Sequence, residues 1–98
     1  MDKTHLYQIS YWQGASGKWY CNDIKNLSGS SAKWYATMRM LGLSIEEFIQ
    51  LLMNYRATNI YYYEPTDLLS FAFESEKEVK AFCSYVNKQA KLKKFYCS

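Results

Sequence analysis

The sequence predicts a single α+β domain with the element order β-β-α-α-β-β-α. Its 98 residues, of which 49% are hydrophobic and 18% aromatic, suffice for one core and not for two domains. Two regions alternate as strands do, and three regions have helical periodicity. We expect residues 1–98 to form one domain, in which one antiparallel sheet of four strands has its helices packed on one face.

The first pair of strands is predicted over residues 6–12 and 18–21. Tyr7, Ile9 and Tyr11 alternate onto one face, and the glycine-containing loop 14–17 separates the two runs, which is typical of a β-hairpin. The segment from Gly14 to Lys18 resembles part of a phosphate-binding loop. It is two residues too short, however, and Trp19 stands where that loop needs Ser or Thr, so a hairpin turn is the better interpretation.

Two helices are predicted in the middle of the chain. The first is capped by Ser30 or Ser31 and ends at Gly42, with Trp34, Met38 and Leu41 at helical spacing. A capping box opens the second, with Ser44 as N-cap and Glu47 at N3. This second helix is expected to bury the following residues: Ile45, Phe48, Ile49, Leu52 and Tyr55.

The two middle helices also resemble a DNA-binding helix-turn-helix, because a glycine lies in the short turn between them. The first turn of the second helix carries Glu46 and Glu47, however, and these carboxylates would face phosphates. A plain helical hairpin is therefore favoured over a major-groove reader.

A second hairpin and a last helix complete the predicted domain. Residues 59–64 and 68–73 flank a turn that contains Pro65 and Asp67. Ser75 and Glu78 form a second capping box, which opens the last helix. The buried face of that helix is predicted to contain Val79, Phe82, Cys83, Val86 and Ala90.

The small net charge of +3 conceals segments of opposite sign. Residues 1–40 carry +3, residues 44–78 carry −5, and residues from 79 onward carry five lysines without an acid. In the last helix, Lys77, Lys80, Lys88 and Lys91 fall within an arc of about 80°, opposite the apolar face, and Lys93 and Lys94 extend it. Such a stripe contacts nucleic-acid phosphates or an acidic protein, or is simply the solvated face of the helix.

Catalytic, metal and membrane sites are not predicted. Three cysteines without a C-x-x-C pair argue against a disulfide framework and a zinc site, and the single histidine, His5, belongs to no nucleophile motif. We therefore expect no enzyme activity, no cofactor and no metal. Residues 1–5 have no signal-peptide pattern and no apolar run is long enough to span a membrane, so we expect a cytoplasmic protein.

Three consecutive tyrosines, Tyr61, Tyr62 and Tyr63, lie in the predicted second hairpin. Alternation sends Tyr61 and Tyr63 to one face of the sheet and Tyr62 to the other. Exposed tyrosines anchor protein interfaces or stack on unpaired bases. Alternatively, they cover a small core or form cross-strand pairs.

Several runs between residues 33 and 91 resemble accessory proteins of phages and mobile elements from low-GC Gram-positive bacteria. They are residues 33–36, 40–43, 47–49, 66–71 and 82–88. The resemblance implies a small single-domain inhibitor that binds a host defence complex in the bacterial cell, as anti-CRISPR proteins do. It supplies no site residues.

These observations favour a non-enzymatic inhibitor that binds a host protein or ribonucleoprotein, such as a CRISPR effector nuclease. Its candidate contacts are Tyr61, Tyr63, Lys77, Lys80, Lys88, Lys91, Lys93 and Lys94. The alternative is a small nucleic-acid-binding protein that uses the basic last helix and the aromatic sheet face. An uncovered aromatic face also allows a homodimer.

Overall fold

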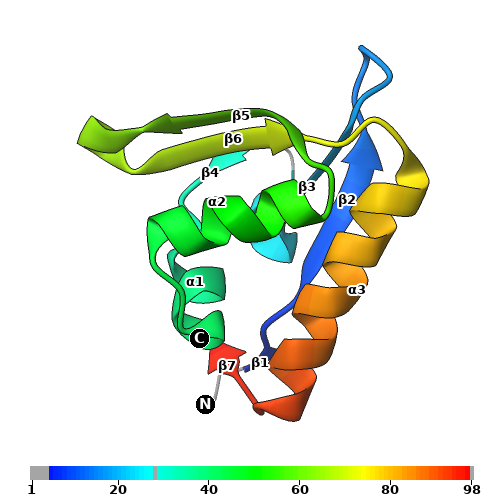
Figure 1. The fold of residues 1–98 in the computed structure, drawn as a ribbon. Coiled ribbons are helices and arrows are strands. Elements are labelled where there is room, and N and C mark those ends of the chain that lie inside the picture. The colour runs from blue at the N-terminus through cyan, green and yellow to red at the C-terminus, as the bar shows by residue number, and fades with distance from the viewer. Residues whose placement is uncertain (1–4, 28, 98) are drawn as a thin grey trace.

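The computed structural model describes residues 5–27 and 29–97; the rest of the predicted domain, residues 1–4, 28 and 98, lies outside the described residues. The described residues form three α-helices and several short antiparallel strands, so the predicted α+β class is confirmed (Figure 1). Along the chain the elements are β1 (His5–Leu6), β2 (Ile9–Gln13), β3 (Trp19–Asp23), the 3₁₀ turn η1 (Ile24–Asn26), β4 (Ser31–Ala32), α1 (Tyr35–Leu41), α2 (Ile45–Asn54), β5 (Thr58–Tyr63), η2 (Glu64–Thr66), β6 (Leu68–Ala72), α3 (Glu76–Leu92) and β7 (Tyr96–Cys97).

The strands form small sheets of two or three strands, so the prediction of one four-stranded sheet is wrong. The described sheets have the strand orders β1-β7, β2-β3 and β4-β6-β5. In the described residues the two predicted hairpins pair at their ends, where Trp19 and Phe73 exchange two backbone hydrogen bonds of 2.8 Å each. The hairpins are thus neighbours without sharing a continuous ladder.

Strand β4 explains why the four-stranded sheet does not form. Ser31 pairs with Ser70 and Ala32 with Leu69, so β4 takes the edge of β6 along which β3 would otherwise pair. The predicted helix cap at Ser30 or Ser31 is therefore also wrong. Helix α1 begins at Tyr35 and has Trp34 as its N-cap, without a side-chain capping bond.

The local turn predictions are confirmed. In the first hairpin Gln13 pairs with Trp19, and in the second Tyr63 pairs with Leu68. Helix α1 ends at Gly42, whose φ of 70° lies in the left-handed region that glycine adopts without strain. Turn η2 closes on Asp67, which is also left-handed with a φ of 57°.

The predicted caps of α2 and α3 are present. The Ser44 backbone N–H donates to Glu47 Oε1 at 2.8 Å, and the Glu47 N–H donates to Ser44 Oγ at 3.2 Å, which completes the capping box. At α3, the Glu78 N–H donates to Ser75 Oγ at 3.4 Å. Of the two hydrogen bonds of the predicted second capping box, this is the one that the described residues form.

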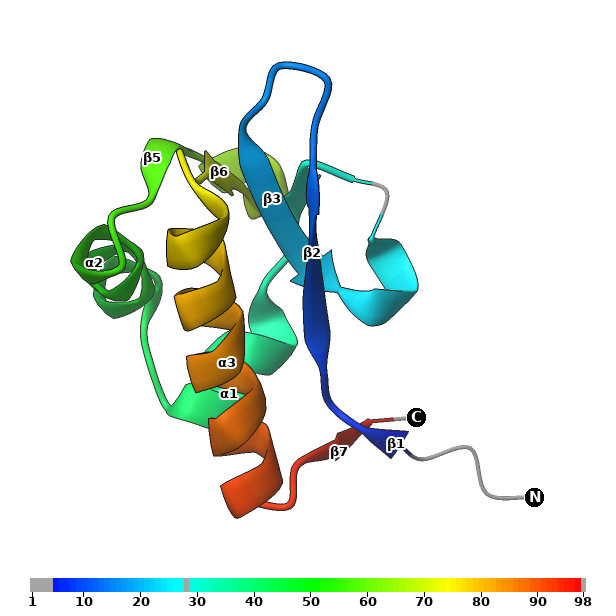
Figure 2. The ribbon, with the colours of Figure 1, turned by 90° about the vertical axis from the view of Figure 1, so that its right-hand side faces the viewer.

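The core is built around α3. Figure 1 shows α2 running along the β5–β6 hairpin, and Figure 2 shows α3 in front of the space between α2 and the β2–β3 hairpin. The Phe82 ring lies 5.7 to 6.3 Å, between centroids, from four rings supplied by α2, its C-cap, β6 and the residue after it. The predicted buried face of α3 is confirmed, since each of its residues is almost completely buried: Val79, Phe82, Cys83, Val86 and Ala90.

The two ends of the described chain pair with each other, which the sequence did not predict. His5 lies opposite Cys97 and Leu6 opposite Tyr96 in the β1-β7 ladder. The Tyr7 N–H also donates to the Phe95 carbonyl oxygen at 2.9 Å. The segment after α3 is thereby fixed against the residues that precede β2.

Candidate partner-binding site

Tyr61 and Tyr63 lie on an open face of the β4-β6-β5 sheet. Their side chains are 60% and 46% exposed, and the two rings stack with centroids 6.5 Å apart and planes 20° apart. Opposite them on the same face are Ser70, which pairs with Tyr61, and Leu68, which pairs with Tyr63. We call the face around Tyr61, Tyr63, Leu68 and Ser70 the tyrosine face.

The tyrosine face follows from the alternation of β5. Tyr62 points to the other side of the sheet, where it is half-buried opposite the buried Leu69 and near Ile45 of α2. Helix α2 runs along that side of the hairpin (Figure 1). The helix therefore covers Ile60 and Tyr62 and leaves Tyr61 and Tyr63 in solvent.

The lysine stripe of α3 is the second predicted surface. In the part of the chain that the structure describes, the ion pair that forms is Lys18–Glu74, at 2.7 Å. The stripe lysines have no carboxylate partner there. All four are exposed: Lys77, Lys80, Lys88 and Lys91.

Lys93 and Lys94 differ from the rest of the stripe. Lys93 Nζ donates to the carbonyl oxygen of Met40, in the last turn of α1, at 2.8 Å. Lys94 has a left-handed φ of 50° in the turn that leads from α3 to β7. Lys93 therefore has a role in the fold that the helical-wheel argument did not reveal.

The two predicted surfaces are not brought together. In Figure 1 the η2 end of the β5–β6 hairpin and helix α3 lie on opposite sides of the molecule, whose longest dimension is 41 Å. One small ligand cannot contact both. A partner that uses both must be large enough to wrap the domain.

A cluster that the sequence argument missed lies at the η2 turn. Asp67 accepts a hydrogen bond from the Tyr35 hydroxyl at Oδ2 and another from the Tyr62 hydroxyl at Oδ1, each at 2.6 Å. These bonds hold the pKa of Asp67 below its usual value, and they raise the pKa of Tyr35 and bring that of Tyr62 to about 12. Tyr35 and Asp67 are 32 positions apart, so the only sequence signal was the turn residue Asp67 itself.

A small pocket adjoins this cluster. It has a volume of about 220 Å³ and lies between α1, the start of α2 and the β5–β6 hairpin. Four of its lining residues are mainly apolar and three form the hydrogen-bonded cluster: Trp34, Met38, Ile45 and Leu69, and Tyr35, Tyr62 and Asp67. We call it the Asp67 pocket.

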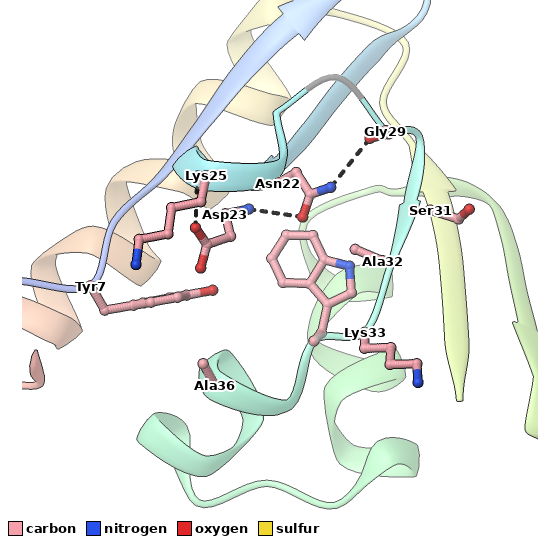
Figure 3. Close-up of a pocket in the computed structure, with 10 residues that line it drawn as sticks. Tyr7, Asn22, Asp23, Lys25, Gly29, Ser31, Ala32, Lys33 and Ala36 are labelled. Carbon is pink, nitrogen blue, oxygen red and sulfur yellow. Dashed lines mark hydrogen bonds between the residues drawn. The ribbon is translucent and has the colours of Figure 1, made fainter. Parts of the chain in front are cut away.

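A larger hollow of about 460 Å³ lies between η1, β4 and the start of α1 (Figure 3). The Asn22 side chain donates to the Gly29 carbonyl oxygen at 3.3 Å and accepts from the Asp23 N–H at 2.8 Å. Asp23 Oδ1 in turn accepts from the Lys25 N–H at 2.8 Å and caps η1. The hydroxyl of the buried Tyr7, which also lines the hollow, forms a hydrogen bond with Thr37 Oγ1. These bonds give the side chains of Asn22, Asp23 and Tyr7 structural roles.

The described residues contain no group of three or more His, Cys, Asp and Glu side chains that could hold a metal ion. Their helices include none that is both long enough and apolar enough to cross a membrane. Comparison of the chain with protein-family models, curated proteins and solved structures finds no match.

Proposed function

We propose that this chain is a non-enzymatic binding protein that holds a protein partner on the tyrosine face. The observation that carries the proposal is the stacked pair Tyr61–Tyr63, which is 60% and 46% exposed on an open sheet face. Tyrosine offers a large contact area at a low cost in side-chain entropy, and it is enriched in the centres of protein interfaces. The half-buried Leu68 beside Tyr63 adds apolar area.

The charges around the tyrosine face favour a protein over a nucleic acid. Glu64 directly follows Tyr63 and is exposed, and the Asp67 carboxylate lies at the end of the same turn, where it accepts from Tyr62 on the other side of the strand. Lys33 is the nearby basic residue that acts on Asp67. A surface of mixed sign lacks the continuous positive potential on which phosphate binding depends.

The narrower role within this proposal is inhibition of a host defence protein or ribonucleoprotein, such as a CRISPR effector nuclease. The resemblance of residues 33–91 to phage accessory proteins supports this role. Expression of the chain in bacteria with an active CRISPR system is then expected to restore transformation by a targeted plasmid. If the CRISPR system still blocks transformation by the plasmid, the narrower role is contradicted. The binding proposal itself is tested separately.

The test of binding is capture of partners from such a bacterial lysate, with and without nuclease treatment. The double variant Tyr61→Ser/Tyr63→Ser should lose a partner that survives nuclease treatment. Tyr96→Ser is the matched control because Tyr96 is equally exposed, at 58%, but lies in β7. If both variants retain the partner, the tyrosine face is not the binding site.

Nucleic-acid binding by the lysine stripe is the alternative function. One observation favours it: four exposed lysines along α3 have no carboxylate partner in the described part of the chain. The triple variant Lys80→Glu/Lys88→Glu/Lys91→Glu should then abolish an affinity for DNA or RNA that falls steeply with salt. Partner capture that is unchanged in this variant supports the tyrosine face.

A further inference from the structure

The hydrogen bonds of the Asp67 pocket leave it with acceptors at its polar side. Each tyrosine hydroxyl has a single proton, and both Tyr35 and Tyr62 give theirs to Asp67. The phenol oxygens and the carboxylate oxygens keep free lone pairs. A ligand that satisfies this side of the pocket must therefore supply hydrogen-bond donors.

The electrostatics of the pocket select a positive charge on those donors. The low pKa of Asp67 keeps its carboxylate ionised at neutral pH, while the raised pKa values of Tyr35 and Tyr62 keep both phenols neutral. Aromatic rings of the kind that line this pocket, including Trp34, also attract cations through their negative faces. With Asp67 ionised and both phenols neutral, the lining carries one negative charge.

The remaining wall selects an apolar stem. Trp34, Met38, Ile45 and Leu69 make up most of the lining, and the volume of about 220 Å³ suits one side chain rather than a large ligand. Lysine and arginine combine a flexible apolar stem with a cationic head that has only donors. No other natural side chain has both features at neutral pH.

We propose that the Asp67 pocket binds a lysine or arginine side chain of the protein partner. The pocket and the tyrosine face share strand β5, in which Tyr62 stands between Tyr61 and Tyr63. A partner seated on the tyrosine face can therefore reach over the strand and place its cation against Asp67. That the cation belongs to a partner rests on the proposed function, whereas the chemistry of the pocket does not.

The test is an NMR titration of the 98-residue protein with Nα-acetyl-arginine methylamide. Nα-acetyl-citrulline methylamide is the matched probe, because it has nearly the same shape and no charge. The arginine probe should shift the methyl signals of Met38, Ile45 and Leu69 and bind about tenfold more tightly than the citrulline probe. Equal affinity for the two probes, or no shifts at these methyl groups, overturns the proposal.

Three variants test whether the Asp67 carboxylate binds the cationic probe. Asp67→Asn removes the charge and suits the left-handed φ of 57°, a region that asparagine tolerates; it should lower arginine affinity about tenfold and leave citrulline affinity unchanged. Lys33→Gln removes a competing cation near Asp67 and should tighten arginine binding. Glu64→Gln is the matched control: Glu64 is an exposed acid of the same turn outside the lining, and its loss should change the affinity less than twofold. Equal effects of the Asp67 and Glu64 variants overturn the proposal.

The titration separates this inference from the proposed function because it uses no partner. Arginine-specific shifts support the pocket even where partner capture is insensitive to Tyr61 and Tyr63, a result that overturns only the tyrosine face. Absence of arginine-specific shifts, with capture still dependent on Tyr61 and Tyr63, overturns only the pocket.

Discussion

Lys93 Nζ donates a hydrogen bond of 2.8 Å to the carbonyl oxygen of Met40, and so ties the C-terminal end of α3 to the last turn of α1. Carbonyl groups in the last turn of a helix lack intrahelical partners, and a cation there also interacts favourably with the helix dipole. The two residues are 53 positions apart. A lysine that the sequence places among the partner contacts therefore has a structural role.

Replacing Lys93 should accordingly destabilise the fold. Lys93→Met keeps most of the apolar stem and removes the donor, and we expect a loss of about 1 kcal/mol in the free energy of unfolding. Urea denaturation measures this loss. Lys91→Met is the control, since Lys91 is exposed and has no such bond to the described residues, and should change stability by less than about 0.5 kcal/mol. Equal losses in the two variants would show that the bond to Met40 does not stabilise the fold.

The capping box of α2 predicts a dependence of stability on acid pH. Hydrogen bonding to the backbone N–H of Ser44, and in second place to its side chain, holds the pKa of Glu47 below its ordinary value of 4.5. Because the folded state binds this proton less readily than the unfolded chain, the stabilisation is present above pH 4.5 and is lost as the pH falls through the lower folded pKa. The stability advantage of the natural protein over Glu47→Gln should therefore be smaller at pH 3 than at pH 6.

Urea denaturation at the two pH values measures that change. Ser44→Ala provides an independent measure of the cap, and should lower stability by about 1 kcal/mol at pH 6. A difference between the natural protein and Glu47→Gln that is the same at both pH values would contradict the role of the carboxylate in the capping box.

The buried pair Tyr7 and Thr37 predicts a dependence on alkaline pH. Burial is the main cause that raises the pKa of Tyr7 above its ordinary value of 10.0. The neutral phenol therefore contributes stability that is fully present below pH 10 and is lost as the pH rises toward the folded pKa. At pH 7, Tyr7→Phe should cost about 1–2 kcal/mol because it leaves the Thr37 hydroxyl without its partner.

The difference between the natural protein and Tyr7→Phe should shrink above pH 10, as followed by urea denaturation. The natural protein and the variant differ only at Tyr7, so the contributions of all other groups cancel. The double variant Tyr7→Phe/Thr37→Val should lose less stability than the sum of the single variants, because it removes both partners. Additive losses, or a difference that does not depend on pH, would contradict the coupling of these two hydroxyls.

Features with local signals were predicted from the sequence. The turn of each hairpin, the end of α1 at Gly42 and the cap at Ser44 each depend on residues within four positions of one another. The exposure of Tyr61 and Tyr63 also has a local cause, since alternation in a strand fixes which side chains share a face.

Features that depend on distant residues were not predicted. Strands β1, β4 and β7 have two residues each, too few to show periodicity, and each forms only because a partner strand lies beside it. For this reason the sequence suggests a helix cap at Ser31 and does not reveal that β4 pairs with β6, beside which the second hairpin was expected to join the first. The Tyr35–Asp67 bond likewise joins elements whose proximity no short-range pattern reveals.

The tyrosine face predicts a separation between binding and stability. Tyr61 and Tyr63 are 60% and 46% exposed, and their stacked rings remain in water, so Tyr61→Ser/Tyr63→Ser should change the free energy of unfolding by less than about 1 kcal/mol in total. Leu69 lies on the opposite face of the same sheet and is 1% exposed; Leu69→Ala should cost about 2–4 kcal/mol. Urea denaturation measures both.

The same variants then show whether loss of partner capture is caused by loss of the exposed tyrosines or by unfolding. Capture should be lost in Tyr61→Ser/Tyr63→Ser at full stability, and retained by Leu69→Ala at temperatures where that variant is still folded. If the tyrosine variant unfolds as readily as Leu69→Ala, the two rings belong to the core and their loss says nothing specific about a partner. A stable tyrosine variant without its partner assigns the binding energy to the exposed rings, because no other part of the molecule has then changed.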